Sequence, residues 1–371
     1  MFLPKGDEEN EGIISKEEPI GYDENKKVVL FRGIKEEEYS EISDFLNQHN
    51  RMSSGNFTLL PKDEISRLVR LGSLNILMRG INKSTLIGTI FSIPFPIRCK
   101  FNSVTEDDSV TEDESKSEES QIVEHCCTSF LTVHQKLRNK GLCMALMREM
   151  TKYGHSKEIY CAYSLTSFPL TPKSLEIRSW YRPINLPRSI GLGFSFLNWN
   201  NPGEFMKNKL LYTTKLPRKY VCIKVDKKLE KALEFYKKIT CDKKFLFLPE
   251  LEFFKKWSQE FPTFLVSFEK KPIGIFSFTT IYCRMITGLE GKLLLPLIFN
   301  SVPEHSTNLM KCLLNIGAEY DYDTLYTHCI GDINQGLLKT INAIQTKDKS
   351  YFSLYNNSMN LDIKDLYIPI F

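Results

Sequence analysis

The feature that most constrains the fold is a strand, a basic turn and a helix that follow one another directly within residues 129–150. The stretch Phe130–Val133 is apolar and partly β-branched, which favours a strand. Arg138–Gly141 has the sequence Arg-Asn-Lys-Gly, which predicts a basic turn. Apolar side chains then recur at helical spacing, at Leu142, Ala145, Leu146 and Met150.

This arrangement predicts a phosphate-binding site at the start of the helix. The first turn of a helix has backbone N–H groups without intrahelical partners and carries the positive end of the helix dipole, and both favour an anion. Gly141 allows the backbone to approach a ligand closely, and Arg138 and Lys140 add positive charge. For this segment taken alone, the alternative is a chance strand–turn–helix with a solvated basic turn.

Length and composition indicate a globular protein. A chain of 371 residues is long enough to bury a large core and predicts two domains or one of double size. The hydrophobic share of 42% and the charged share of 25% are ordinary for such proteins. The net charge of +4 comes from 49 basic and 45 acidic residues. This balance does not favour nucleic acid as a partner.

Neither a metal site nor a targeting segment is expected. The ten cysteines have no C-x-x-C spacing, the adjacent Cys126 and Cys127 fit a strand, and the six histidines form no ligand cluster. Reduced thiols in a cytoplasmic protein are the expectation. The N-terminal sequence turns acidic within nine residues, so no signal peptide is predicted. No apolar run approaches the roughly 18 residues that a membrane-spanning helix needs.

The predicted elements repeat in the same order in the two halves of the chain. Each half is predicted to contain a helix, a hairpin, a second helix and a strand, which indicates a structural duplication. The first-half elements are a helix at 36–49, strands at 73–78, 84–93 and 130–133, a helix at 142–153 and a strand at 159–163. The second-half elements are helices at 229–239 and 253–257, strands at 264–268 and 273–280, a helix at 307–316 and a strand at 325–328.

Three segments are predicted to lack regular structure. Residues 1–25 are polar and acidic and predict an extended arm. Residues 103–120 nearly repeat the acidic sequence Ser-Val-Thr-Glu-Asp and cannot bury enough apolar surface to order themselves, so a disordered hairpin tip is expected, with a phosphorylatable regulatory loop as the alternative. Prolines at 169, 172, 183 and 187 predict a loop region.

Several of these strings resemble N-myristoyltransferase. Residues 130–140 resemble that family's Phe-Leu-Cys-Val-His-Lys-Lys-Leu-Arg strand, and the loop from Arg138 to Cys143 is similar to the CoA loop of the acetyltransferase superfamily. Residues 86–94 resemble the family's Leu-Val-Gly-Phe-Ile-Ser-x-Ile-Pro strand. Weaker similarity extends over residues 178–217 and recurs at Leu354-Tyr-Asn356.

The resemblance implies both a fold and an activity. The fold would be α+β, a mixed α/β architecture with two pseudo-symmetric acetyltransferase-like halves around a continuous twisted, saddle-like mixed sheet flanked by helices. Residues 1–216 would form the acyl-CoA-binding half, and residues 217–371 would contribute the peptide site and a terminal carboxylate. The implied reaction transfers a C14 acyl group from myristoyl-CoA to the α-amine of an N-terminal glycine.

The resemblance also implies catalytic roles. The backbone N–H groups of Phe130 and Leu131 would stabilise the oxyanion, a role in which side-chain identity matters little. The α-carboxylate of Phe371 would accept the proton of the incoming amine, whereas an ordinary terminal edge strand is the alternative for this apolar chain end. Thr166, or alternatively Ser164, would take the place of a threonine that assists the amine.

Binding residues follow from the same alignment. The residues implied in acyl-CoA binding are Phe130, Leu131, Thr132, Val133, Arg138, Asn139, Lys140, Gly141, Leu142 and Cys143. The residues implied in peptide binding are Tyr181, Phe194, Ser195 and Leu354. Myristoyl-CoA would be a co-substrate, with no permanently bound cofactor and no metal. Other expected properties are a cytoplasmic monomer without a transmembrane segment and polypeptide substrates that include nascent chains at the ribosome.

The sequence also departs from the family. Gly141 stands where the family has a basic residue, and Cys143-Met144 replaces Ala-Pro. The family's N-terminal Phe-Trp motif has no match, and its glycine-rich Gly-x-Gly-Asp-Gly loop aligns with residues 343–349, which contain no glycine. Cys329 aligns with a family aspartate. Two alternatives therefore stay open: a small-acyl N-acetyltransferase that shares only the CoA loop, and a catalytically inactive acyl-CoA- or peptide-binding homologue.

Overall fold

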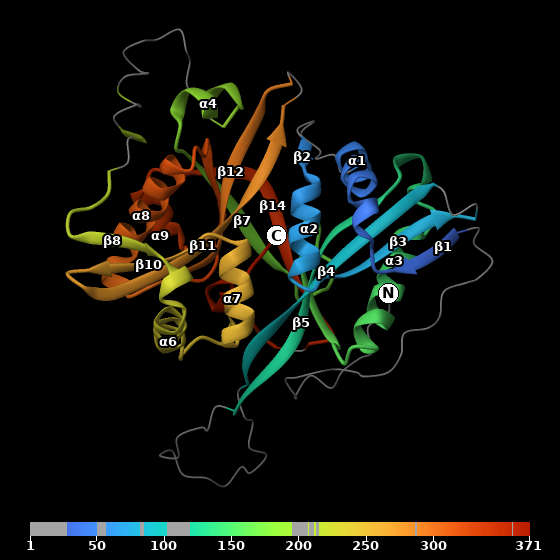
Figure 1. The fold of residues 1–371 in the computed structure, drawn as a ribbon, viewed down its shortest axis with the longest axis horizontal. Coiled ribbons are helices and arrows are strands. Elements are labelled where there is room, and N and C mark those ends of the chain that lie inside the picture. Colours follow the sequence, from blue (N-terminus) through green and yellow to red (C-terminus); the bar gives the residue numbers. More distant parts are fainter. Residues whose placement is uncertain are drawn as a thin grey trace.

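The strands of the protein form one large open sheet (Figure 1). The computed structural model describes residues 28–49, 57–81, 85–101, 119–194, 207, 211–212, 215–285, 288–357 and 359–371. Within this part of the chain the sheet contains 15 strands, and its main path runs β1-β3-β4-β5-β6-β14-β7-β13-β12-β11-β10-β8. The mixed, open and twisted sheet flanked by helices confirms the predicted fold class.

The elements of the first half extend from β1 to α4. They are β1 (Val28–Arg32), α1 (Tyr39–His49), β2 (Phe57–Leu59), α2 (Lys62–Arg70), β3 (Leu74–Gly80), β4 (Leu86–Phe101), β5 (Glu119–Val133), α3 (Leu142–His155), β6 (Cys161–Thr166), β7 (Leu175–Pro183) and α4 (Leu186–Gly191). Short 3₁₀ helices precede α1, as η1 (Glu36–Glu38), and α3, as η2 (Gln135–Leu137).

The elements of the second half follow a matching order. They are β8 (Tyr220–Lys224), η3 (Val225–Lys227), α6 (Leu229–Ile239), β9 (Phe245–Phe247), α7 (Leu251–Glu260), β10 (Thr263–Phe268), β11 (Lys271–Arg284), β12 (Glu290–Ser301), η4 (Pro303–His305), α8 (Ser306–Glu319), β13 (Thr324–His328), α9 (Gln335–Thr340), β14 (Ile344–Tyr355), η5 (Ile363–Asp365) and β15 (Leu366–Tyr367). The predicted repeat of helix, hairpin, helix and strand is confirmed.

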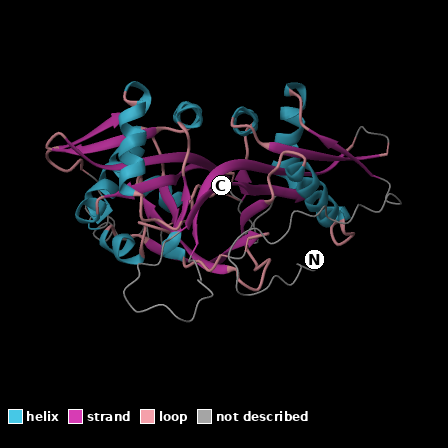
Figure 2. Cartoon of the chain, turned by 90° about the horizontal axis from the view of Figure 1, so that it is seen from below, coloured by secondary structure: helices cyan, strands magenta, loops and turns pink. Residues whose placement is uncertain are grey.

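The two halves exchange strands at the centre of the sheet. β14 lies between β6 and β7, and β7 lies between β14 and β13. Strand β7 of the first half therefore pairs with β13 of the second, while β14 of the second half pairs with β6 of the first. Figure 2 shows the strands as a curved band with helices packed around both ends. The sheet order is consequently symmetric about the antiparallel β7–β14 pair.

Two predictions about local structure are wrong. The region with four prolines is not all loop, because Leu175–Pro183 forms β7, with Pro183 only as its last residue. Residues 103–118 lie outside the described residues, but Glu119 and Ser120 belong to β5 rather than to a hairpin tip. The predicted extended arm at residues 1–25 also lies outside the described residues.

Strand β4 continues through two prolines, beyond its predicted end. Its pairing with β3 stops at Ser92 and its pairing with β9 begins at Ile97, so Pro94 and Pro96 fall between these two ladders, where β5 is the one paired strand. The Pro96 oxygen also accepts a hydrogen bond from the Leu248 N–H, which requires no N–H of the proline. A proline lacks the N–H that a strand with two neighbours would need. The prolines are tolerated because they occupy this singly paired stretch.

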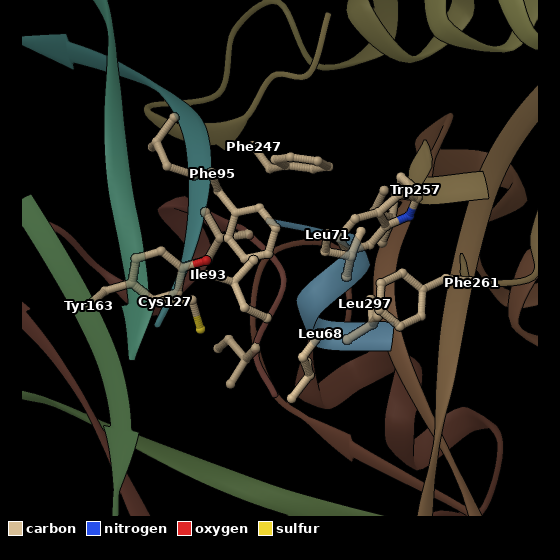
Figure 3. Packing of buried hydrophobic residues seen from close by; sticks show 14 of the residues in the cluster. Leu68, Leu71, Ile93, Phe95, Cys127, Tyr163, Phe247, Trp257, Phe261 and Leu297 are labelled. Atoms are coloured by element: carbon tan, nitrogen blue, oxygen red, sulfur yellow. The ribbon is translucent and has the colours of Figure 1, made fainter. Parts of the chain in front are cut away.

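Helix α3 packs closely on the sheet, and the largest core cluster lies elsewhere. Leu142, Leu146 and Met150 are buried against β3 and β4, and a Cβ at Gly88 would lie 3.0 Å from Leu146. The largest cluster contains aromatic side chains from both halves, among them Phe95 and Trp257 (Figure 3). It also takes in the apolar chain end, because Leu366, Ile368 and Ile370 are buried in it.

Candidate active site

Strands β5 and β6 diverge beside the predicted catalytic residues. They pair in parallel only from His125 opposite Cys161 to Cys127 opposite Tyr163. Strand β5 then continues to Val133, still paired with β4 on its other side. From Thr128 to Val133, β5 therefore has no strand partner among the described residues on the side of β6, and we call this unpaired stretch between the two strands the opening.

A β-bulge interrupts β5 at the predicted oxyanion residues. The β4–β5 register passes from Phe91 opposite Ser129 to Thr89 opposite Thr132, so Phe130 and Leu131 together face one residue of β4. Phe130 has a φ of 52°, a left-handed conformation that is uncommon for a non-glycine residue. A bulge rotates the local backbone out of the ladder, and such bulges are frequent next to active sites.

The predicted phosphate loop has the expected shape. Asn139 and Gly141 have φ values of 63° and 72°, and Gly141 is the N-cap of α3 without a side-chain cap. The side chains of Arg138, Lys140 and Cys143 are exposed. Burial raises the pKa of the Cys143 thiol, and the nearby Arg138 charge opposes this shift. The start of α3 therefore presents backbone N–H groups and positive charge to solvent.

Other predicted CoA-binding residues turn their side chains into the core. Val133 and Leu142 belong to the hydrophobic cluster beneath α3, and Thr132 is 4% exposed. Any ligand contact of Val133 and Leu142 would therefore come from the main chain. Side-chain contacts with the CoA phosphates would fall to Arg138 and Lys140 in the exposed turn.

The end of α1 also contacts the loop, which the sequence did not predict. Arg138 donates a hydrogen bond from Nη2 to the backbone oxygen of His49, at 2.6 Å. The His49 ring also lies 4.3 Å from that of His134, measured between ring centroids. Arg138 thus links α1 to the loop in addition to supplying charge. No sequence pattern marks this contact, since the two residues are 89 positions apart.

The chain end enters the core from the second half. The Tyr367 hydroxyl donates to Asp332 at 2.8 Å, and the Tyr163 hydroxyl donates to the backbone oxygen of Pro369 at 3.0 Å. Figure 1 shows the C-terminus near the middle of the molecule, between the two halves. In Figure 3 the Tyr163 hydroxyl points into the cluster beside Cys127. These two bonds hold the terminal segment in a defined path.

The last residue lies against the strand that carries the bulge. The Cys127 thiol contacts the backbone of Phe371. Burial raises the pKa of this thiol to about 12, although the contacts with Tyr163 and with the Phe371 backbone both act to lower it. The Phe371 ring stacks on Phe95, with ring centroids 6.1 Å apart and planes at 12°. Cys127 precedes Phe130 by three positions. The structure therefore places Phe371 beside β5, the strand that contains Phe130 and Leu131.

The predicted amine-assisting residue lies at the end of β6. The Thr166 hydroxyl donates to the backbone oxygen of Phe168 at 2.6 Å, so its proton is already engaged. Ser164 and Leu354 belong to the β6–β14 ladder, in which Ser164 is opposite Ser353 and Leu354 is opposite Tyr163. Leu354 also packs against the largest core cluster. A role for Thr166 or Ser164 stays a prediction.

The predicted peptide residues come together only in part. The rings of Tyr181 and Phe194 lie 5.7 Å apart, with Tyr181 buried in β7 and Phe194 just beyond α4. Ser195 lies outside the described residues. Asp323 holds α4 in place through two hydrogen bonds. Its carboxylate accepts one from Arg188, and its backbone oxygen accepts one from the Ser189 hydroxyl. Asp323 has no distinguishing sequence signal.

A family model matches part of the first half of the chain. Residues 70–174 match the model described as the N-terminal domain of myristoyl-CoA:protein N-myristoyltransferase. This part of the chain is therefore similar to the N-terminal domain of an acyltransferase family. The matched segment includes the β-bulge and the phosphate loop described above.

Solved structures share the fold along almost the whole chain. Saccharomyces cerevisiae N-myristoyltransferase with bound myristoyl-CoA matches with a TM-score of 0.78 and 14% identity, over 98% of this chain and 91% of that one. A second structure of the yeast enzyme, with myristoyl-CoA and inhibitors, matches with a TM-score of 0.77 and 15% identity, over 97% of this chain and 91% of that one. No curated protein sequence matches.

The described residues contain no helix that is both long and apolar enough to cross a bilayer. In the same part of the chain, no three histidine, cysteine, aspartate or glutamate residues are grouped in a way that would hold a metal ion.

Proposed function

We propose that this protein transfers the myristoyl group of myristoyl-CoA to the α-amine of an N-terminal glycine. The observation that carries the proposal is the contact between the Phe371 backbone and the Cys127 thiol, three positions before the bulge at Phe130. This contact supports the proposal because it places the last residue of the chain against β5, the strand that contains the bulge. A direct acyl transfer needs a base for the amine and donors for the oxyanion.

The proposed mechanism has three steps. The glycine ammonium gives a proton to the Phe371 carboxylate, and the neutral amine that results attacks the thioester carbon. The oxygen of the resulting tetrahedral intermediate accepts hydrogen bonds from the backbone N–H groups of Phe130 and Leu131. The C–S bond then breaks and the new amide forms, while the proton that the attacking nitrogen loses passes to the sulfur, so that CoA leaves as its thiol. One preorganised oxyanion donor typically contributes a factor of about 10²–10³ to the rate.

The two halves would divide the work of binding. Residues 1–216 would bind the CoA pyrophosphate at the α3 start, and residues 217–371 would supply the terminal carboxylate and much of the peptide site. Tyr181 belongs to the first half in sequence, but it pairs with Tyr326 of β13 and with Ile344 of β14, which both belong to the second half. The Phe194 ring contacts that of Tyr181. The proposed partners are polypeptides with an N-terminal glycine, including nascent chains, and the proposed form is a cytoplasmic monomer.

The direct test is an acylation assay. The protein is mixed with myristoyl-CoA and an octapeptide that begins Gly-x-x-x-Ser, and the mass of the peptide is measured. The expected result is an added C14 acyl group, which is absent when the octapeptide is N-acetylated. If myristoyl-CoA binds but no peptide of this class gains mass, the inactive acyl-CoA-binding homologue becomes the better description.

A small-acyl acetyltransferase is the remaining alternative. It would need only one acetyltransferase-like half, whereas the yeast enzyme shares the fold of 98% of this chain. A one-half acetyltransferase would also not require the apolar chain end to be buried in a core that both halves share. Acetyl-CoA, tested in the same assay, would distinguish the two: faster acetyl than myristoyl transfer would contradict the proposed function.

A further inference from the structure

Three buried hydroxyl groups beside the bulge have no hydrogen-bond partner in the described part of the chain. They belong to Thr89, Ser129 and Thr132. Thr89 is 0% exposed and Thr132 is 4% exposed. Leaving a buried hydroxyl without a partner costs free energy, so native proteins seldom retain one. Three such hydroxyl groups close together on β4 and β5 therefore require an explanation.

Their position connects them to the proposed oxyanion site. Thr89 on β4 is directly opposite Thr132 on β5, and Thr132 follows the bulged residues Phe130 and Leu131 immediately. Directly opposite residues of an antiparallel pair place their side chains on the same face of the sheet. The two threonine hydroxyls consequently form a pair at the border of the opening between β5 and β6.

The same two strands contain a satisfied pair of hydroxyls. Ser92 is opposite Thr128, and their hydroxyl oxygens are 2.9 Å apart in a hydrogen bond. The β4–β5 ladder is therefore able to satisfy facing hydroxyls before the bulge and fails to do so after it.

We propose that the Thr132 hydroxyl binds the thioester carbonyl oxygen of the acyl-CoA, with Thr89 positioning it. When the ligand is bound, Thr132 donates to the carbonyl oxygen and accepts a hydrogen bond from Thr89. The contact supplements the backbone N–H groups of Phe130 and Leu131 and strengthens as the oxygen gains negative charge. This inference rests on the proposed function, because it assumes that the thioester lies at the bulge.

The test compares two ligands that differ at the carbonyl. Myristoyl-CoA has the thioester oxygen, whereas the thioether S-tetradecyl-CoA lacks it and keeps the CoA and the alkyl chain. We expect Thr132→Val to weaken myristoyl-CoA binding about tenfold and Thr89→Val to weaken it two- to threefold, in line with ordinary hydrogen-bond contributions. Binding of S-tetradecyl-CoA should stay unchanged in both variants.

Thermal stability of the free protein separates this role from a structural one. Valine removes an unpartnered hydroxyl at nearly constant shape, so Thr89→Val and Thr132→Val should leave the melting temperature unchanged or raise it. The matched control is Thr128→Val, which leaves the Ser92 hydroxyl without its partner. This control should lower the melting temperature by a few degrees and leave myristoyl-CoA binding unchanged.

Three results would overturn the inference. They are unchanged myristoyl-CoA affinity in Thr132→Val, an equal loss of affinity for both ligands, and a fall in melting temperature comparable with that of Thr128→Val. Failure of the unaltered protein to bind myristoyl-CoA would instead refute the proposed function itself, together with this inference. The unaltered protein is therefore measured first.

Discussion

The corresponding strand–turn–helix segments of the two halves are alike in backbone and unlike in chemistry. In the first half β5 pairs in parallel with β6 and then separates from it, and in the second half β12 pairs with β13 only at Leu293 and Leu294. Both long strands have a register shift after the separation, at Phe130–Leu131 in β5 and next to Pro296 in β12. The duplication therefore repeats the opening as well as the elements.

The turns that follow are different. The first has the sequence Arg-Asn-Lys-Gly, with two left-handed residues, Asn139 and Gly141, before α3. The second, Val302–His305, contains a proline and a glutamate, and no described residue in it has a positive φ. The backbone N–H of Ser301 donates to Asp332. The second half consequently has neither the charge nor the loop shape of a phosphate site.

The second opening is also partly filled by the chain itself. Residues of β12, including Leu297 and Asn300, line a cleft together with Leu366, Tyr367 and Ile370 of the terminal segment. In the first half the last residue arrives from outside the repeat and stops at Cys127. One scaffold therefore provides two openings, and residues of the terminal segment line the cleft at the second one.

The largest expected effect comes from moving the terminal carboxylate. Adding two glycines after Phe371 keeps its ring but displaces the charge, and we expect the turnover rate to fall by about 10²–10⁴, the usual contribution of a general base. Myristoyl-CoA affinity, measured separately by calorimetry, should stay unchanged. The control is Phe371→Leu, which keeps the carboxylate in place. Normal turnover in the extended protein would remove Phe371 from the mechanism.

The next effect concerns the turn that only the first half has. Replacing Arg138 and Lys140 with alanine should raise the dissociation constant of CoA about a hundredfold, because charge-assisted phosphate contacts are lost. Arg148→Ala with Lys157→Ala changes the net charge equally, on and just after the same helix, and should leave CoA affinity nearly unchanged. If both double variants bind CoA alike, general electrostatic attraction rather than this loop holds the ligand.

Much of this comparison could be predicted from the sequence, because its main parts are local. The turn at Arg138–Gly141 and the helix after it are contiguous, and the helix predicted at residues 229–239 has the bounds of α6. Strand β7 was missed because prolines surround it, although tertiary pairing with β13 and β14 determines it. The path of the chain end depends on contacts such as Tyr163 with Pro369, which are 206 positions apart.

A smaller effect should appear in the pH dependence of stability. Burial lowers the pKa of His125, in β5, and of His328, in β13, to about 4. The unfolded chain binds protons below about pH 6.5, whereas these folded groups stay neutral until about pH 4. Stability should therefore fall as the pH falls through this window, by roughly 2 kcal/mol per histidine between pH 7 and pH 5.

Single substitutions assign this loss to each half. Denaturant unfolding at pH 7 and pH 5 should show a shallower pH dependence in His328→Gln and in His125→Gln than in the unaltered protein. The Nε2 atom of His125 accepts a hydrogen bond from Asn357, and Nδ1 lies 3.1 Å from the Val123 backbone oxygen, so this ring is held as the neutral form. A pH dependence that neither substitution reduces would mean that other groups cause the acid sensitivity.

The smallest expected effect concerns the hairpin in which the halves differ most in length. Strands β4 and β5 are paired up to Phe101 opposite Glu119, whereas their counterparts β11 and β12 are paired up to Arg284 opposite Glu290. The second half thus joins equivalent strands through Met285–Leu289 alone. Replacing residues 102–118 with Met-Ile-Thr-Gly-Leu should therefore change the free energy of unfolding by less than about 0.5 kcal/mol, since loop length affects stability weakly, and should leave turnover unchanged.

A matched variant in which Ser and Thr replace the acidic residues of the segment separates charge from length. A folded short-hairpin protein without activity, beside an active charge variant, would show that the insertion takes part in the reaction and that the two hairpins differ in function as well as in length.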